Sequence, residues 1–443
     1  MLSVELSDTL TRYRIEFDLR GVLTVSEPIR IGIVGCGRIL PAHLRGYALL
    51  REKGFDDFRI TALFSRKRQD AEMFRKRGEG PPPRPPVSNR PSDPLSVPHS
   101  YVSDFQPEVD AEVFDDFSSL LASGSVDALD IPASVFTHHD YAVKAAHAGI
   151  HVLAQKPLAV SVAAGRNMVT AASQNGITLG VTENVRYAPP MRYTRWGIER
   201  GEIGEIQMVA SVAIGTPEWS PDKVVADTPW RHSKLLAGGG ATLDIGVHLF
   251  HRVRFLCGNV KSISALARTF EPLRYRRDAK GNVSETVHSD ADDAFMATFE
   301  LENGAIGQAS FSWAGHGPPT SLPEGFAIYG SRGCIKGDTL YRDGRPSISV
   351  TALFEQEATP AEREHWLPGG YTDSFAACFY DFIGAIRQRR KMEASGEEGL
   401  SDLATAFSIL ESSAAGRTVS VADVLNGAIH TAQREIDAYY ALG

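Results

Sequence analysis

The sequence predicts an α/β protein, with a doubly wound parallel sheet followed by an α+β domain built on a large, mostly antiparallel sheet. Short apolar runs alternate with helix-like segments up to about residue 183, which is typical of parallel strands covered by helices on both faces. Beyond residue 184, strand-like runs follow one another with few helices between them. The 443 residues, 43% of them apolar, suit a globular protein of two or three domains.

The expected elements follow in order along the chain. Parallel strands are predicted at 31–35, 59–64, 112–114, 128–131, 151–154 and 177–181, and helices at 38–51, 66–77, 138–149 and 161–174. Ser161 is a favourable N-cap for the last of these helices, and Gly176 stands just past its end. In the second domain, Asn303-Gly304 between two apolar runs indicates a tight hairpin. Helices at 371–390 and 402–416 close the chain.

These patterns divide the chain into an N-terminal extension (1–27), a dinucleotide-binding domain (28–183) and a substrate-binding domain (184–443). In the extension, apolar and charged residues alternate from Arg12 to Arg20, which predicts one strand of unknown partner. An insertion at 78–104 holds eight prolines between residues 80 and 98, so it cannot supply regular strands or helices. It is interpreted as a passive extended surface loop or as a proline-rich partner-binding motif.

Composition excludes several classes of protein. The net charge of −8 gives no reason to expect nucleic acid or a membrane surface as a partner, and no apolar run reaches about 18 residues. Charges interrupt the N-terminus, so a signal peptide is not expected. The four cysteines are too widely spaced for a zinc knuckle or a disulfide framework. A reducing compartment, the cytoplasm, is therefore predicted.

The loop after the first predicted strand reads GCGRIL, residues 35–40. Glycine at its first and third positions permits a tight turn and close approach of the backbone to a pyrophosphate at a helix N-terminus. Leu40 stands where a third glycine or alanine is usual. Because the loop follows a strand and opens a helix, Gly35, Gly37, Arg38 and Ile39 are predicted to bind a dinucleotide. A structural turn without a ligand is the alternative.

The second predicted strand bears on which dinucleotide binds. Asp56 and Asp57 precede that strand, and therefore stand at the end away from the ligand. Its carboxyl end carries Ser65 and Arg66, which would not repel a 2′-phosphate and could grip it. NADP(H) is therefore favoured, with NAD(H) possible. The alternative is that the basic residues 66–68 form a solvated first helical turn.

Asp244, His248 and His251 are spaced four and three residues apart, so a helix would present them on one face. One carboxylate and two imidazoles suit a metal site, a proton-transfer site or ordinary helix residues. Lys156 lies just past the fifth predicted strand, at the sheet edge where ligands bind in such folds. The spacing alone leaves the three interpretations open.

Three ordered motifs together resemble the Gfo/Idh/MocA family of NAD(P)-dependent oxidoreductases, which includes glucose–fructose oxidoreductase and inositol dehydrogenase. They are GCGRIL at 35–40, IHVLAQKPL at 150–158 and GGGATLDIGVH at 238–248. The resemblance runs from about Ile29 to Val421 and implies a Rossmann domain followed by a substrate domain. The family's Glu-Lys-Pro signature is Gln155-Lys156-Pro157 here, so one negative charge beside the lysine is missing.

The resemblance also assigns roles. It places Lys156, Gln155 and His138 near the cofactor, and Asp244 and His248 at the acid and base positions. Histidine suits removal of a hydroxyl proton near neutral pH, and an ammonium group can stabilise a developing alkoxide. The family works without a metal, so none is expected, and His251 is expected to face protein. The pairs Arg186-Tyr187 and Trp230-Arg231 are predicted substrate contacts, with domain-interface packing as the alternative.

The predicted reaction is reversible oxidation of a secondary alcohol on a sugar, glycoside or cyclitol, by a homo-oligomer. One alternative is a glycoside-cleaving enzyme that retains its nicotinamide cofactor for transient oxidation. Another is a non-catalytic, ligand-sensing regulator of the same fold, against which the joint presence of Lys156, Asp244 and His248 argues.

Overall fold

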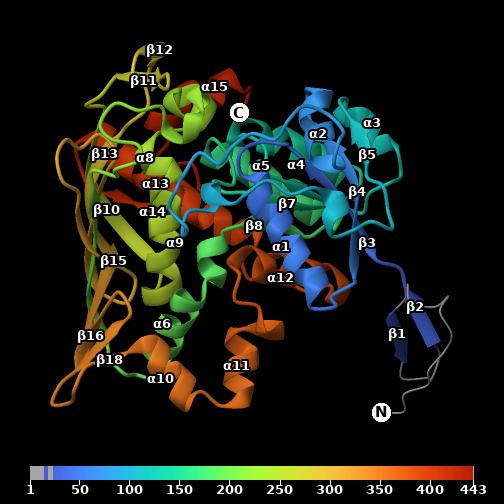
Figure 1. The fold of residues 1–443 in the computed structure, drawn as a ribbon. Helices are drawn as coiled ribbons and strands as arrows, with labels where there is room; N and C mark the ends of the chain where they lie inside the picture. The colour runs from blue at the N-terminus through green and yellow to red at the C-terminus, as the bar shows by residue number, and fades with distance from the viewer. Residues whose placement is uncertain (1–13, 18–22, 443) are drawn as a thin grey trace.

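Two large sheets lie side by side in the computed structural model, which describes residues 14–17 and 23–442 (Figure 1). The first is a six-stranded parallel sheet with the order β5-β4-β3-β6-β7-β8. Its strands are β3 (Ile29–Val34), β4 (Phe58–Phe64), β5 (Glu112–Phe114), β6 (Ala128–Ile131), β7 (His151–Gln155) and β8 (Leu179–Thr182). These are the six runs that the sequence predicts, so the doubly wound parallel sheet is confirmed.

Helices pack on both faces of this sheet: α1 (Leu40–Glu52), α2 (Arg68–Arg75), α3 (Phe117–Ala122), α4 (His138–His147) and α5 (Val162–Asn175). As expected, the Ser161 hydroxyl caps α5 by accepting from the Ala164 amide, and Gly176 ends the helix with a φ of 64°. The charged helix begins at Arg68 instead of residue 66, because Lys67 has an extended backbone. Arg66 therefore belongs to the turn after β4.

The second sheet has nine strands in the order β18-β17-β16-β15-β9-β14-β13-β10-β19, and only the β14–β9 pair among those described is parallel. Its strands are β9 (Ile206–Ile214), β10 (Val260–Arg268), β13 (Ala294–Leu301), β14 (Ile306–Ser312), β15 (Thr320–Gly330), β16 (Gly333–Lys336), β17 (Thr339–Arg342), β18 (Ile348–Ser349) and β19 (Val419–Ser420). The predicted hairpin joins β13 to β14, with Gly304 at a φ of 86°. The mostly antiparallel second sheet is thus confirmed.

Helices cover the inner face of the nine-stranded sheet and fill the space between the two sheets (Figure 1). They include α6 (Pro189–Glu199), α8 (Ala241–Asp244), α9 (Gly246–Cys257) and α13 (Gly396–Ala415), while α10 (Val350–Glu357) and α11 (Pro360–Trp366) follow the sheet's edge strands. A separate two-stranded sheet pairs β11 (Leu273–Arg277) with β12 (Val283–His288).

The last long helices return to the parallel sheet. The Phe379 ring, on α12 (Ser374–Gln388), stacks on the Tyr47 ring of α1 at 4.1 Å. Leu403 and Phe407 of α13 are fully buried in the same apolar cluster as the sheet strands. The α13 helix also contacts β10 of the second sheet, so it ties the two sheets together.

The N-terminal extension contains two strands where one was predicted. The β1 strand (Arg14–Phe17) pairs antiparallel with β2 (Leu23–Ser26), so the expected strand finds its partner inside the extension itself. The flanking Tyr13 and Leu19 of the predicted alternation lie outside the described residues.

All four cysteines carry free thiols, and three of them are buried. Burial raises the pKa of the Cys257 thiol to about 12. Across residues 14–17 and 23–442, no helix is both long enough and apolar enough to cross a membrane.

Candidate active site

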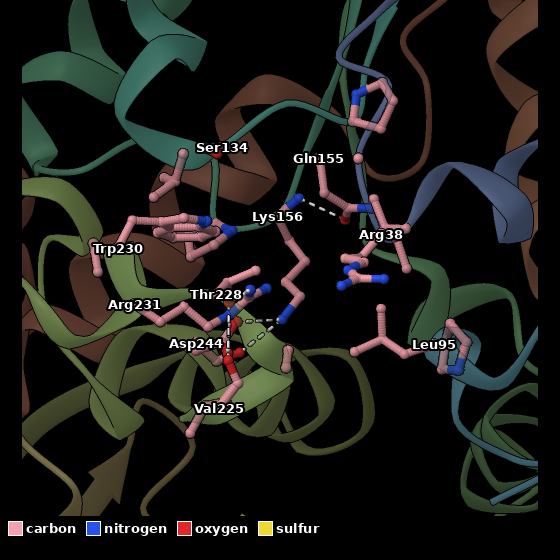
Figure 2. Close-up of a pocket in the computed structure, with 18 of the residues that line it drawn as sticks. Arg38, Leu95, Ser134, Gln155, Lys156, Val225, Thr228, Trp230, Arg231 and Asp244 are labelled. Carbon is pink, nitrogen blue, oxygen red and sulfur yellow. Dashed lines mark hydrogen bonds and ion pairs between the residues drawn. The ribbon is translucent and has the colours of Figure 1, made fainter. Parts of the chain in front are cut away.

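A cavity of about 870 Å³ opens at the carboxyl edge of the parallel sheet, against the helices and inner face of the second sheet. In doubly wound folds this edge binds ligands, because the turns after several parallel strands meet there. Twelve of the residues singled out from the sequence line it: Gly35, Gly37, Arg38, Ile39, Ser65, Arg66, Gln155, Lys156, Trp230, Arg231, Asp244 and His248. Figure 2 shows Lys156 at the centre, facing Asp244, with Arg38 and Leu95 on the opposite wall.

The phosphate-loop end of the cavity has the features that a dinucleotide requires. Gly35 has a φ of 108°, and a Cβ atom there would lie 2.6 Å from Ala133 Cα, so only glycine fits. A Cβ atom on Gly37 would meet nothing within 4 Å, which leaves room for close approach of a ligand. The α1 helix has no side-chain cap, so no side chain competes for the positive end of its dipole, which faces the phosphate loop. The Leu40 and Ala42 amides already donate to the carbonyls of Gly37 and Ile39, so an anion would be bound by the loop and not by these two groups. Leu40 is fully buried and packs α1 onto the protein core. These residues fit a bound dinucleotide pyrophosphate.

Arg66 and Arg68 differ in what they contact. Arg68 forms an ion pair with Glu72 at 3.1 Å on the outer side of α2. Arg66 lines the cavity, and its guanidinium lies 5.7 Å from the centre of the Phe136 ring. Within the part of the chain that the structure describes, no carboxylate pairs with Arg66. The turn after β4 therefore places one unneutralised cation, Arg66, in the cavity beside Ser65.

The proline-rich insertion folds over this cavity. Arg84 donates a hydrogen bond to the Cys36 carbonyl at 3.3 Å and pairs with Asp70. Arg90 forms a 3.3 Å ion pair with Glu218, in the loop after β9. The side chain of Leu95 packs against the apolar cluster of the second sheet and lines the cavity. The insertion is thus a surface loop that also contacts both domains and forms one wall of the cavity.

Lys156 and Asp244 form the central ion pair. Lys156 Nζ lies 3.0 Å from Asp244 Oδ1 and 2.8 Å from the Asp244 carbonyl oxygen. Arg231 Nε lies 3.1 Å from the other carboxylate oxygen. Burial alone would raise the pKa of Asp244, but Lys156 and Arg231 outweigh it and hold that pKa below its ordinary value. Asp244 is thus a permanent carboxylate that fixes both cationic side chains (Figure 2).

His248 is held by a residue that the sequence analysis missed. Its Nδ1 atom lies 2.5 Å from Oε1 of Glu183, which follows β8 directly and is 3% exposed. Burial opposes ionisation of Glu183, yet its interaction with His248 lowers the pKa of Glu183 to about 2. Burial and the charge of Lys156 outweigh Glu183 and lower the pKa of His248. At neutral pH, Glu183 therefore accepts the Nδ1 proton of a neutral imidazole, leaving Nε2 unprotonated.

One signal could have revealed Glu183. It is the first residue after the sixth parallel strand, at the edge where Lys156 also stands. A carboxylate in that position is a candidate for the ligand-binding edge of the sheet.

Gln155 connects Lys156 to a buried chain of polar side chains. Its Oε1 accepts from the Lys156 amide at 2.8 Å, so its Nε2 faces the Nε2 of His43 at 2.9 Å. Since the amide nitrogen can only donate, His43 Nε2 is unprotonated, and Nδ1 donates to Asp130 at 2.7 Å. Gln155, which stands where the family has glutamate, therefore donates a hydrogen bond to the unprotonated Nε2 of His43. His43 and Asp130, both fully buried, were not singled out from the sequence.

Three other predicted residues do not line the cavity. His138 is fully buried, with its ring nitrogens 3.0 Å from the carbonyl oxygens of Ala133 and Pro157, so it joins two cavity loops from behind. Arg186 pairs with Glu393, and Tyr187 is buried and donates to a carboxylate of α12.

The motif from Gly238 to His251 does not form one continuous helix. The α8 and α9 helices are separated at Ile245, whose φ is −106°. His251 is buried and points to Asp402 at 2.7 Å, whereas His248 points to Glu183. The three side chains of the predicted face therefore have three separate sets of partners. Among the described residues, no group of three or more His, Cys, Asp or Glu side chains could hold a metal ion.

Asp292 sets the start of α8. Its carboxylate accepts from the amides of Gly240 and Thr242, each at 2.8 Å. A Cβ atom on Gly240 would lie 1.7 Å from the Asp292 carbonyl oxygen, so the glycine is required for this close approach. The resulting turn places Asp244 opposite Lys156.

Comparison with known proteins agrees with this arrangement. The profile described as "Oxidoreductase family, NAD-binding Rossmann fold" matches residues 95–183, and that of the GFO/IDH/MocA C-terminal domain matches residues 191–336. The first match begins inside the proline-rich insertion, after the phosphate loop. Both halves of the family's domain organisation are therefore present.

Among relatives, levoglucosan dehydrogenase of Pseudarthrobacter phenanthrenivorans is 26% identical over 330 residues, which cover 70% of this chain and 83% of that protein. Inositol 2-dehydrogenase of Rhizobium meliloti is 25% identical over 301 residues, covering 68% of this chain and 82% of that protein. D-glucoside 3-dehydrogenase of Escherichia coli is 23% identical over 287 residues, covering 63% of this chain and 69% of that protein.

The solved structures show the same fold. Levoglucosan dehydrogenase in complex with NADH and L-sorbose superposes with a TM-score of 0.70 at 21% identity, covering 89% of this chain and 99% of that chain. An oxidoreductase from Thermotoga maritima superposes with a TM-score of 0.64 at 24% identity, covering 90% of this chain and 100% of that chain. With both domain profiles matched and the cavity at their junction, this protein is an oxidoreductase of the Gfo/Idh/MocA family.

Proposed function

We propose that this protein transfers a hydride reversibly between a nicotinamide cofactor and a secondary alcohol of a sugar, glycoside or cyclitol. The observation that carries the proposal is one cavity with the phosphate loop at one end and the Lys156–Asp244 and His248–Glu183 pairs at the other. The relatives' names support the substrate class, since they include dehydrogenases of levoglucosan, D-glucosides and inositol.

The side chains divide the chemistry between them. When bound, the nicotinamide ring supplies the hydride acceptor. Nε2 of His248 takes the hydroxyl proton, and Glu183 stabilises the imidazolium that forms. The Lys156 ammonium, held by Asp244, donates to the same hydroxyl oxygen and stabilises the developing alkoxide. Arg231 anchors Asp244 from the other side, so the ammonium keeps its position through the reaction.

We propose that NADP(H) is preferred to NAD(H). Support comes from the Arg66 guanidinium, which lines the cavity beside Ser65 without a carboxylate partner in the described chain. A guanidinium can form two charge-assisted bonds to a 2′-phosphate.

We also propose that the protein is a homo-oligomer, assembled through the outer face of the nine-stranded sheet. Tyr329, Met208 and Ile306 form one row across β15, β9 and β14, and Leu266 stands opposite Met296 on β10 and β13. These apolar side chains are 39–60% exposed, which is typical of a surface that another subunit covers. Light scattering on Met296→Asp should show dissociation if this face is the interface.

The free thiols further support a reducing compartment, the cytoplasm.

A substrate screen tests the proposed reaction. Sugars, glycosides and cyclitols are offered with NAD⁺ and with NADP⁺, and the absorbance of reduced nicotinamide is followed. Accumulation of reduced cofactor in proportion to the oxidised sugar is expected. Release of sugar from a glycoside without net reduction would instead indicate cleavage with a retained cofactor. Tight ligand binding without turnover of any compound would indicate a sensor.

A further inference from the structure

Arg252 is a second unneutralised cation in the cavity. It follows His248 by four residues on α9, so both side chains leave the same face of the helix, about 5–6 Å apart at Cβ. Both line the cavity, together with the apolar rings of Phe311 and Trp313 from the second sheet. Arg252 therefore belongs to the end of the cavity where the alcohol is oxidised.

The guanidinium of Arg252 is only partly satisfied. Its Nη1 donates to the backbone carbonyl of Glu324 at 3.1 Å, and its centre lies 5.4 Å from the Phe326 ring. Its Nε is buried and makes no hydrogen bond. Burial disfavours the charged form and lowers the pKa of Arg252, opposed by the charges of Glu324 and Glu183. A buried cation without an adjacent counter-ion is costly unless a ligand supplies one.

Most other cations that line the cavity are neutralised by carboxylates: Lys156 and Arg231 by Asp244, Arg38 by Asp227, Arg84 by Asp70 and Arg90 by Glu218. In the part of the chain that the structure describes, Arg66 and Arg252 alone line the cavity without such a partner. Arg66 stands at the dinucleotide end. The charges of Glu324 and Glu183 act on Arg252, but neither carboxylate forms an ion pair with it in the described chain, and Glu183 is already engaged by His248. The substrate end thus contains one cation, Arg252, that no carboxylate pairs with in the described chain.

We propose that Arg252 binds a carboxylate of the substrate, so that the preferred substrates are sugar acids or their glycosides and not neutral sugars. A guanidinium matches a planar carboxylate through two parallel N–H donors. The one-turn separation from His248 is on the scale of a single sugar ring, so one ring can present its alcohol to His248 and its carboxylate to Arg252. This inference rests on the proposed function, because it names the substrate class of the same site.

Matched substrate pairs test the inference. Methyl glucuronoside is compared with methyl glucoside, and galacturonate with galactose, in the wild type, Arg252→Gln and Arg252→Lys. In the wild type, kcat/KM for the acid should exceed that for its neutral partner by roughly tenfold to a hundredfold, the range of a charge-assisted hydrogen bond. In Arg252→Gln this ratio should fall to near one, mainly through a higher KM for the acid. Arg252→Lys should keep part of the preference.

The control variant is Arg66→Gln, which removes the other unneutralised cation and should leave the ratio of acid to neutral substrate unchanged. A wild-type ratio near one, or a ratio that Arg252→Gln does not alter, would overturn the inference while the oxidoreductase assignment stands. Stronger turnover of glucose 6-phosphate than of glucuronate would also overturn it, because the anion would then be a phosphate.

A binding measurement separates this inference from the proposed function. Methyl glucuronoside is titrated by calorimetry into the protein with reduced cofactor, in the wild type and in Arg252→Gln. If no sugar is oxidised but binding weakens by tenfold or more in the variant, the carboxylate site stands and the proposed reaction fails. If binding is absent or equal in both proteins, the carboxylate site is overturned whatever the turnover.

Discussion

The Nδ1 atom of His248 lies 2.5 Å from Oε1 of Glu183, although the two residues are 65 positions apart in the chain. The contact joins α9, which carries the proposed base, to the end of β8 in the parallel sheet. It holds the imidazole in the tautomer whose Nε2 can accept a proton. The parallel sheet thereby positions a side chain of the C-terminal domain.

Replacing Glu183 should change both the rate and its pH dependence. Glu183→Ala leaves the imidazole without its acceptor, so kcat should fall by roughly tenfold or more, a part of the 10²–10⁴ that general base catalysis contributes. Glu183→Gln keeps an acceptor oxygen and should retain more activity than the alanine variant. KM for the cofactor should stay similar in both.

The sign of the pH effect follows from the charge of Glu183. Alcohol oxidation needs neutral His248, so kcat/KM should fall as the pH drops through the His248 pKa, which lies below the ordinary value for histidine. The carboxylate of Glu183 raises that pKa, and Glu183→Gln removes it. The acid limb of the profile should therefore move to lower pH in the variant. An unmoved limb would show that His248 is not the group that titrates.

His248→Ala and Lys156→Ala should each lose about two or more orders of magnitude in turnover, because both act on the same hydroxyl group: His248 takes its proton and Lys156 stabilises its oxygen. Both variants should still bind cofactor, which fluorescence titration of the reduced form can measure. The phosphate loop lies at the other end of the cavity and is not altered by either change. Near-full turnover of His248→Ala with a good substrate would refute the assignment of the base.

Arg66→Ala should weaken NADP(H) binding by about tenfold or more and leave NAD(H) binding nearly unchanged, since one charge-assisted bond to phosphate is lost. Arg68→Ala is the matched control, because Arg68 is engaged by Glu72 and does not line the cavity. Dissociation constants for both cofactors measure the effect. Tighter NAD(H) binding in the wild type, with no response to the loss of Arg66, would contradict the preference.

The ion pair between Arg90 and Glu218 ties the insertion to the second domain across the cavity. Because the pair is partly exposed, it contributes at most about 1 kcal/mol, so Arg90→Ala or Glu218→Ala should speed cofactor release by up to about fivefold. Stopped-flow displacement of the bound cofactor measures the rate. The double variant should release the cofactor at the same rate as either single variant, because each change removes the same ion pair. Arg77→Ala, which breaks a pair with Asp104 away from the cavity, is the control.

Much of this protein is determined by local sequence. Mostly apolar runs of three to seven residues locate the parallel strands, because strands covered by helices on both faces bury most of their side chains. The residue after each strand then stands at the ligand-binding edge, which makes the phosphate loop, Ser65 and Lys156 recognisable in the chain itself. The family motifs likewise single out Asp244 and His248, which with Lys156 and the phosphate loop line one cavity.

Only the tertiary structure decided which of these residues face one another. Helical spacing suggested a shared face for Asp244, His248 and His251, but the break at Ile245 and the packing of α13 send them to different partners. Sequence periodicity does not distinguish Arg66, which lines the cavity, from Arg68, which pairs with Glu72. It also does not show that the proline-rich segment lies over the cavity. Each of these outcomes depends on contacts between segments far apart in the chain, and local sequence determines the conformation of each segment without determining what it meets.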